Sequence, residues 1–124
     1  MQSLDESSFD EAITRAEGLV VIDFWAPWCG PCQAVTPTLE ALAERYSEGA
    51  SFYKVNADEA PRLMSAFNLR SVPTVLILKP HEGGARVLDA LVGAQTERRY
   101  ERWLERYLNP KPGLVSRLTG LFKA

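Results

Sequence analysis

The two cysteines of this chain lie three positions apart, directly after an apolar stretch. Residues 19–26 are mostly β-branched or aromatic, which predicts a strand buried on both faces. Pro27 begins a tight turn that carries Cys29 and Cys32, and apolar residues at helical spacing resume at Val35. The sequence therefore predicts a pair of thiols at the junction of a buried strand and a helix.

A structural purpose for this pair is weakly supported. A disulfide between Cys29 and Cys32 closes a very small loop, so it constrains the unfolded chain little. A structural zinc site needs four ligands, and His81 is the single histidine. The other alternative is a pair of inert core cysteines. The position of the pair at the end of a strand argues against it. We therefore interpret the pair as reactive thiols.

The predicted helix gives the two thiols different roles. Cys29 lies at the helix N-terminus, where unpaired N–H groups and the helix dipole should lower the pKa of its thiol and favour a nucleophilic thiolate. Cys32 lies one turn further on, from where it can attack a mixed disulfide formed at Cys29. Pro31 suits the first turn of a helix and stiffens the segment between the cysteines.

The hydrophobic pattern predicts helices and strands in the order helix, strand, helix, strand, helix, strand, strand, helix, with a short strand before the first helix as an open alternative. The expected ranges are a helix over 5–17, a strand over 19–26, a helix kinked at Pro37 and stopped by Gly49, a strand over 51–56, a helix capped by Asp58, a strand over 72–78, a hairpin turn over 79–85, a strand over 86–92 and a helix over 96–108. This order predicts an α/β fold with a mixed sheet and helices on both faces.

A chain of 124 residues suffices for one domain, which we place at residues 1–109. The formal net charge of -2 argues against a nucleic-acid-binding protein, where a strong basic excess is expected. The N-terminus lacks the basic and apolar segments of a signal peptide, so the expected location is cytoplasmic.

Residues 110–124 form a separate tail, whose apolar residues would share one face of a helix and whose charged residues are all basic. The apolar set is Leu114, Val115, Leu118, Leu121 and Phe122, and the basic set is Lys111, Arg117 and Lys123. Three hypotheses stay open: packing of an extra helix on the body, docking on a partner or weakly on a membrane, and disorder. Membrane contact is not the favoured one.

The residues from Phe24 to Cys32, Phe-Trp-Ala-Pro-Trp-Cys-Gly-Pro-Cys, resemble the active-site segment of thioredoxins. The resemblance covers roughly residues 3–108 and includes Asp23, Pro37, Lys54, the Val72-Pro73-Thr74 triplet and Val92-Gly93. It implies a thioredoxin fold with a mixed four- to five-stranded central sheet. The chain departs from the common pattern at Gln33, where a lysine is frequent, in a longer hairpin around His81, and in the tail.

The resemblance also implies roles for residues around the dithiol. Asp23 would act through water as acid and base for Cys32, with Lys54 beside it, and burial should raise the pKa of Asp23. The alternative is a structural Asp23 paired with Lys54. Val72 and Pro73 would be joined by a cis bond packed against the dithiol. Val72 would pair with an extended substrate segment, and Trp28 and Gly93 would flank the surface that receives it. Trp25 is either site wall or core.

Family members with glycine and proline between the cysteines resemble reductants, and those with a histidine there resemble oxidases and isomerases. By this resemblance, Gly30 and Pro31 favour a reductant. The expected activity is protein-disulfide reduction, in which Cys29 attacks and Cys32 resolves, with the redox-active disulfide and no bound cofactor or metal. The expected partners are disulfide-containing client proteins and, as the resemblance implies, a flavin-dependent reductase that uses NADPH. A binding module or co-chaperone with dispensable cysteines, and an envelope redox protein with a dedicated client, are the alternatives.

Overall fold

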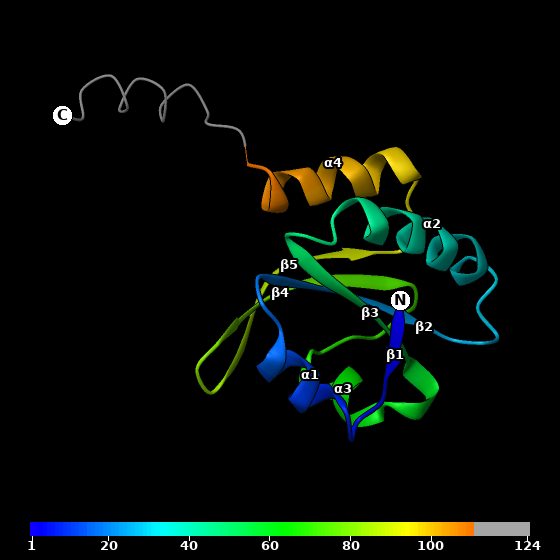
Figure 1. Cartoon of the computed structure of the whole chain (residues 1–124). Coiled ribbons are helices and arrows are strands. Elements are labelled where there is room, and N and C mark those ends of the chain that lie inside the picture. Colours follow the sequence, from blue (N-terminus) through cyan, green and yellow to red (C-terminus); the bar gives the residue numbers. More distant parts are fainter. Residues whose placement is uncertain (111–124) are drawn as a thin grey trace.

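The computed structural model describes residues 1–110, which form one sheet covered by helices (Figure 1). The elements are β1 (Gln2–Leu4), α1 (Phe9–Arg15), β2 (Leu19–Trp25), α2 (Cys32–Arg45), β3 (Ala50–Asn56), the 3-10 helix η1 (Ala57–Glu59), α3 (Pro61–Ala66), β4 (Thr74–His81), β5 (Gly84–Val92) and α4 (Glu97–Leu108). The strand order is β1-β3-β2-β4-β5. The first three of these strands are parallel, and β4 runs antiparallel to both β2 and β5.

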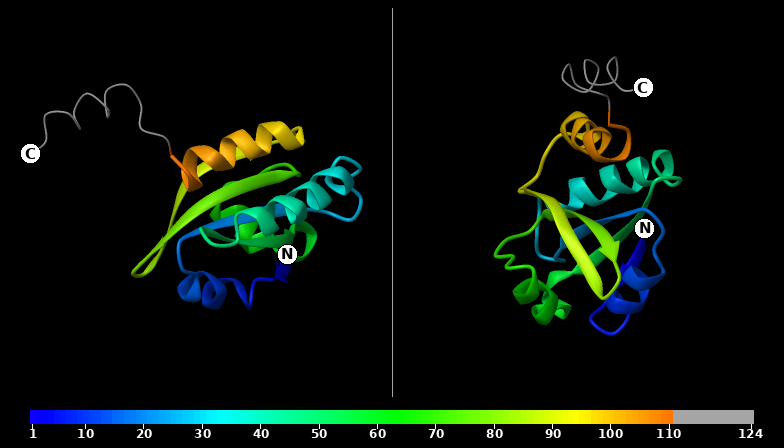
Figure 2. Two further views of the ribbon diagram at one scale, coloured as in Figure 1. Left: turned by 45° about the horizontal axis from the view of Figure 1, so that its top comes forward. Right: turned by 90° about the vertical axis from the view of Figure 1, so that its left-hand side faces the viewer.

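The sheet separates two layers of helices, with α2 and α4 on one face and α1 and α3 on the other (Figures 1 and 2). Successive residues of β2 point to opposite faces. Val21 packs in the cluster that includes residues of α2 and α4, whereas Val20 and Ile22 pack with residues of α1. All five inner residues of β2 are buried, so the predicted two-sided burial of this strand is confirmed.

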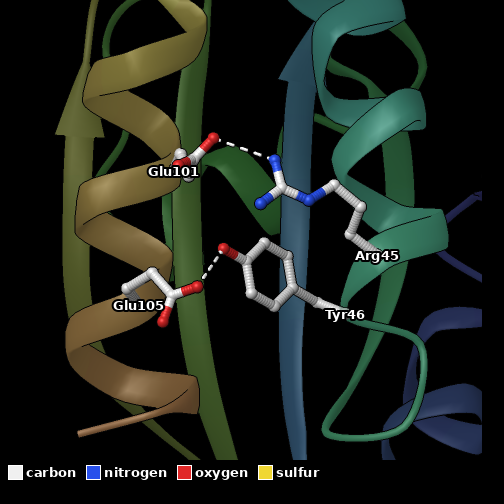
Figure 3. A network of polar contacts seen from close by, with 4 residues as sticks. All are labelled: Arg45, Tyr46, Glu101 and Glu105. Carbon is white, nitrogen blue, oxygen red and sulfur yellow. Dashed lines mark hydrogen bonds and ion pairs between the residues drawn. The ribbon is translucent and has the colours of Figure 1, made fainter. Parts of the chain in front are cut away.

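A polar network ties α4 to the C-terminal end of α2 (Figure 3). Arg45 donates from Nη1 to Glu101 Oε2 at 2.8 Å, and the Tyr46 hydroxyl donates to Glu105 Oε1 at 2.7 Å. Burial, together with the bond to Glu105, raises the pKa of Tyr46 to about 12, so its hydroxyl stays a donor at neutral pH. The network holds the helix that carries Cys32 against its neighbour.

The predicted order of elements is confirmed, and the short strand before the first helix is present as β1. The first helix is shorter than the predicted range 5–17. The Asp5 carboxylate accepts the N–H groups of Ser7 and Ser8 in a turn, so the helix starts only at Phe9. It stops before Ala16, whose backbone is extended.

Two further predictions of local structure are wrong. The hairpin turn comprises Glu82 and Gly83 rather than residues 79–85, because β4 continues through Pro80 as an edge segment that pairs with β5 alone. Asp58 is not the cap of the third helix. The Asn56 side chain instead accepts the Asp58 N–H and caps η1, and α3 begins separately at Pro61.

The hypotheses for the tail concern residues that, apart from Pro110, lie outside the described part of the chain. Within residues 1–110, no helix has both the length and the apolar character that crossing a membrane requires.

Candidate active site

Cys29 and Cys32 are joined by a disulfide, with their Cα atoms 5.4 Å apart. The helix α2 begins at Cys32, so Cys29 lies just ahead of it rather than in its first turn. The Cys32 N–H donates to Cys29 Sγ at 3.2 Å. Since the first N–H groups of a helix have no partner inside it, this contact directs the positive end of α2 at the sulfur of Cys29. The arrangement favours a thiolate at Cys29.

The pair lies in a small apolar cluster at the carboxyl end of the central strand β2. Both cysteines are buried, as is Ala26, and Trp25 and Val72 pack against them. The Ala26 carbonyl accepts the Cys29 N–H at 3.1 Å, which ties the turn to the end of β2. By contrast, Gly30 and Pro31 are exposed. The two cysteines therefore pack against apolar residues on one side, and the turn between them faces solvent.

The segment before β4 brings Val72 and Pro73 to the dithiol. The Val72–Pro73 peptide bond is cis, as the resemblance implied. The Gly93 N–H donates to the Pro73 carbonyl at 2.8 Å, so the end of β5 is fixed to this segment. Gly93 has a φ of +85°, a backbone conformation that favours glycine. The structure thus places three of the predicted substrate-binding residues on neighbouring backbone.

Asp23 is buried in β2, with 1% of its surface exposed. Its Oδ2 accepts a hydrogen bond from the Thr36 hydroxyl at 2.6 Å, and its Oδ1 is buried without a partner among the described residues. Burial raises the pKa of Asp23 to about 6, against the lowering effects of the Thr36 hydrogen bond and the Lys54 charge. A carboxylate with this pKa can both take and return a proton near neutral pH.

Lys54 lies beside Asp23 in the sheet, since the two residues are partners in the β2–β3 register. Its ammonium nevertheless bonds to Glu40 Oε1 on α2 at 3.3 Å. The described residues therefore do not form the direct Asp23–Lys54 ion pair that the structural alternative requires. Lys54 acts on Asp23 through its charge, and Glu40 partly opposes that effect by raising the pKa of Asp23.

A cavity of about 270 Å³ opens beside Cys32. Its lining comprises Trp25, Ala26, Pro27, Cys32, Gln33, Thr36, Pro37 and Lys54. Trp25 therefore contributes to the wall of the site, and its Nε1 is buried without a partner among the described residues. Among residues 1–110, no cluster of three or more histidine, cysteine, aspartate or glutamate side chains is placed to hold a metal ion.

Sequence reasoning did not assign Asp58 or Val92 to the site. The Trp28 indole, 71% exposed, donates from Nε1 to both carboxylate oxygens of Asp58 at 3.1 Å. Trp28 and Asp58 follow β2 and β3, and the carboxyl ends of parallel strands meet at one edge of a sheet, so their order along the chain was a usable signal. Val92, 60% exposed, precedes Gly93 and adds apolar surface near the Pro73 segment.

Comparison with known proteins identifies the family. The Thioredoxin family model matches residues 1–106. A chloroplastic M-type thioredoxin of Spinacia oleracea is 40% identical over 110 residues, which are 89% of this chain and 59% of that protein. The chain thus spans under two thirds of the length of this relative. A thioredoxin of Synechocystis is 40% identical over 105 residues, 85% of this chain and 94% of that protein. With its five-stranded mixed sheet and its helices on both faces, the chain has the thioredoxin fold and belongs to the thioredoxin family.

Proposed function

We propose that this chain is a protein-disulfide reductase that works through Cys29 and Cys32. The observation that carries the proposal is the disulfide at the start of α2, whose Cys29 sulfur accepts the first helical N–H. This contact distinguishes the two sulfur atoms, although both cysteines are buried. The reduced protein would therefore attack with Cys29, because the helix N-terminus stabilises a thiolate there.

The reaction is an exchange of two electrons between a dithiol and a disulfide. The Cys29 thiolate attacks one sulfur of the substrate, so that a mixed disulfide forms and the first substrate thiolate leaves. Cys32 then loses its proton to Asp23 through water and attacks Cys29 Sγ. The Cys29–Cys32 bond forms, the bond to the substrate breaks, and the second substrate thiolate leaves and takes up a proton. The substrate disulfide is reduced and the chain is oxidised.

The substrate surface we propose surrounds Cys29. Trp28 is exposed on one side of the turn, and Val72 packs against the cysteines while Pro73 is held by the Gly93 N–H. An extended segment of a client could add backbone hydrogen bonds at Val72 and apolar contacts at Trp28 and Val92. Binding of this kind depends mainly on the backbone of the client and little on its particular side chains. It therefore suits disulfide-containing proteins of many sequences.

The chain leaves this reaction oxidised and needs a donor of electrons. We propose a flavoprotein reductase of the thioredoxin-reductase type that uses NADPH, and no cofactor on this chain beyond the redox-active disulfide. The proposed compartment is the cytoplasm, where thiols are kept reduced. The relative from Spinacia oleracea is chloroplastic by its name, so fractionation of the source cells is the direct check on the compartment.

The test is reduction of insulin disulfides by dithiothreitol, followed as turbidity, with the intact protein and with a Cys29→Ser variant. We expect strong acceleration by the intact protein and none by the variant. Cys32→Ser should instead accumulate a covalent mixed disulfide, visible by mass spectrometry, because attack still occurs and resolution does not. No acceleration by the folded intact protein would contradict reductase function.

A binding module is the second candidate, and the exposed apolar side chains of Trp28 and Val92 favour it. Such a module would hold an unfolded client without needing its cysteines. A Cys29→Ser, Cys32→Ser double variant separates the two functions. Full suppression of client aggregation by this variant, with no insulin reduction by the intact protein, would favour the module.

A further inference from the structure

We propose that Thr36 is a positioning residue of the dithiol site, whose hydroxyl holds one oxygen of Asp23 so that the other oxygen is left to exchange a proton with Cys32. The inference rests on the proposed function for the role of Cys32. It adds a residue on α2 that the active-site segment does not contain, and its first observation is the contact of 2.6 Å between Thr36 Oγ1 and Asp23 Oδ2.

The geometry leaves the two oxygens of Asp23 unequal. The Thr36 hydroxyl occupies Oδ2, whereas Oδ1 is buried with no hydrogen-bond partner among the described residues. An unpartnered buried carboxylate oxygen is costly, so it calls for an explanation, of which a catalytic role is one. Because a hydroxyl has a single hydrogen, Thr36 can satisfy one oxygen and no more. Oδ1 is therefore the atom left for the proton.

Thr36 also connects the buried carboxylate with the surface. It lines the cavity beside the dithiol together with Cys32 and Lys54, and it lies four residues after Cys32 in α2. Residues four apart share one face of a helix, so Cys32 and Thr36 face the sheet from the same side. One helix thus carries both the thiol that loses its proton and the hydroxyl that orients the acceptor.

Thr36 stabilises the ionised form of Asp23. A hydroxyl that donates to a carboxylate favours its charged form, and this hydrogen bond lowers the pKa of Asp23 against the larger effect of burial. Among the described residues, the other charged or titratable groups that interact with Asp23 are Lys54 on β3, Glu40 on α2 and Tyr100 on α4. Its partner on β4 in the sheet register is the apolar Val75. Thr36 is thus the direct donor, and the charges act from further away.

The test replaces Thr36 by valine, which keeps the branched shape and removes the hydroxyl, and by serine, which keeps the hydroxyl. Thr38→Val is the matched control, because Thr38 lies in the same helix and its hydroxyl donates to the Ala34 carbonyl instead. The readout is the ¹³C titration of the Asp23 carboxyl group in the oxidised full chain, which needs no substrate. We expect Thr36→Val to raise the pKa of Asp23 by about one unit, with Thr36→Ser and Thr38→Val close to the original protein.

A second readout is the pH profile of the step in which Cys32 resolves a mixed disulfide at Cys29. It should move upward in Thr36→Val by the same amount and return in Thr36→Ser. An unchanged Asp23 titration in Thr36→Val would overturn the proposal whatever the activity. A shifted titration with an unchanged rate profile would overturn the link between Asp23 and Cys32, which belongs to the proposed function, and would support Thr36 as the residue that positions Asp23. Thr36→Ala serves in the same way should the valine variant not fold.

Discussion

Asp23, in the centre of the sheet, lowers the free energy of unfolding when its carboxyl group is ionised, so its effect on stability depends on pH. Its pKa is about 6 in the folded chain and 3.8 when unperturbed. The folded state therefore binds its proton more tightly, so the stability that this group contributes is complete below about pH 4 and is lost as the pH rises through 6. A shift of about two units corresponds to roughly 3 kcal/mol. Ionised Asp23 thus destabilises the chain at the pH where it would act as a base.

Asp23→Asn removes the charge while keeping the shape of the side chain. We expect a gain of up to about 3 kcal/mol in the free energy of unfolding at pH 8, and little change at pH 4. Urea denaturation at both pH values, on the oxidised protein, measures the difference. An equal change at both pH values would mean that packing and not ionisation explains the effect. The same variant should slow the resolution of mixed disulfides by Cys32.

Asp58 is expected to orient the exposed indole of Trp28, since it accepts the Nε1 hydrogen bond with both carboxylate oxygens. Asp58→Ala should lower the rate of insulin reduction about fivefold, from a lost hydrogen bond of about 1 kcal/mol. The rate with a small aromatic disulfide, which needs less of the surface, should change less than twofold. Glu59→Ala is the control, because it removes the same charge from the same 3-10 helix. An equal loss in that variant would assign the effect to charge.

At the scale of elements, each of the parallel strands β2 and β3 is preceded by a glycine, and the two glycines have different conformational requirements. Gly18 has a φ of +76°, and a Cβ built on it would lie 2.7 Å from the Gly49 carbonyl oxygen. Gly49 has no atom within 4 Å of its own Cβ position. Gly18 is therefore needed for both its backbone conformation and the close approach of the two strands, and Gly49 is not.

These two positions provide a matched pair of variants. Gly18→Ala should destabilise the fold by about 2 kcal/mol or more, from left-handed strain and the contact with Gly49. Gly49→Ala should be neutral or stabilising by up to about 1 kcal/mol, because alanine restricts the unfolded chain. The midpoints of urea denaturation give both changes in the free energy of unfolding, provided that the slope of this free energy against urea concentration stays constant. Similar losses in the two variants would contradict the distinction.

At the scale of the whole molecule, the sequence predicted most of what depends on local patterns. The buried strand β2, the dithiol at its end and the order of the elements follow from spacing, and burial of Asp23 follows from its place in an apolar strand. The contact of Thr36 with Asp23 depends on how α2 packs on the sheet, which periodicity does not specify, whereas the proximity of Asp58 and Trp28 follows from two neighbouring parallel strands that end side by side. Pro80 misled the prediction of the hairpin because proline breaks central strands and is tolerated at edges.

The sheet and both helical layers lie within residues 1–110, and the family match ends at residue 106. We therefore predict that a chain ending at Pro110 keeps its free energy of unfolding within about 0.5 kcal/mol, with the same dependence on urea, because every buried core residue that the structure describes is kept. Its insulin reduction should equal that of the full chain. Loss of more than about 1 kcal/mol would mean that residues 111–124 contribute to the packed core. Unchanged stability with lost reduction of one particular client would instead assign those residues to partner recognition.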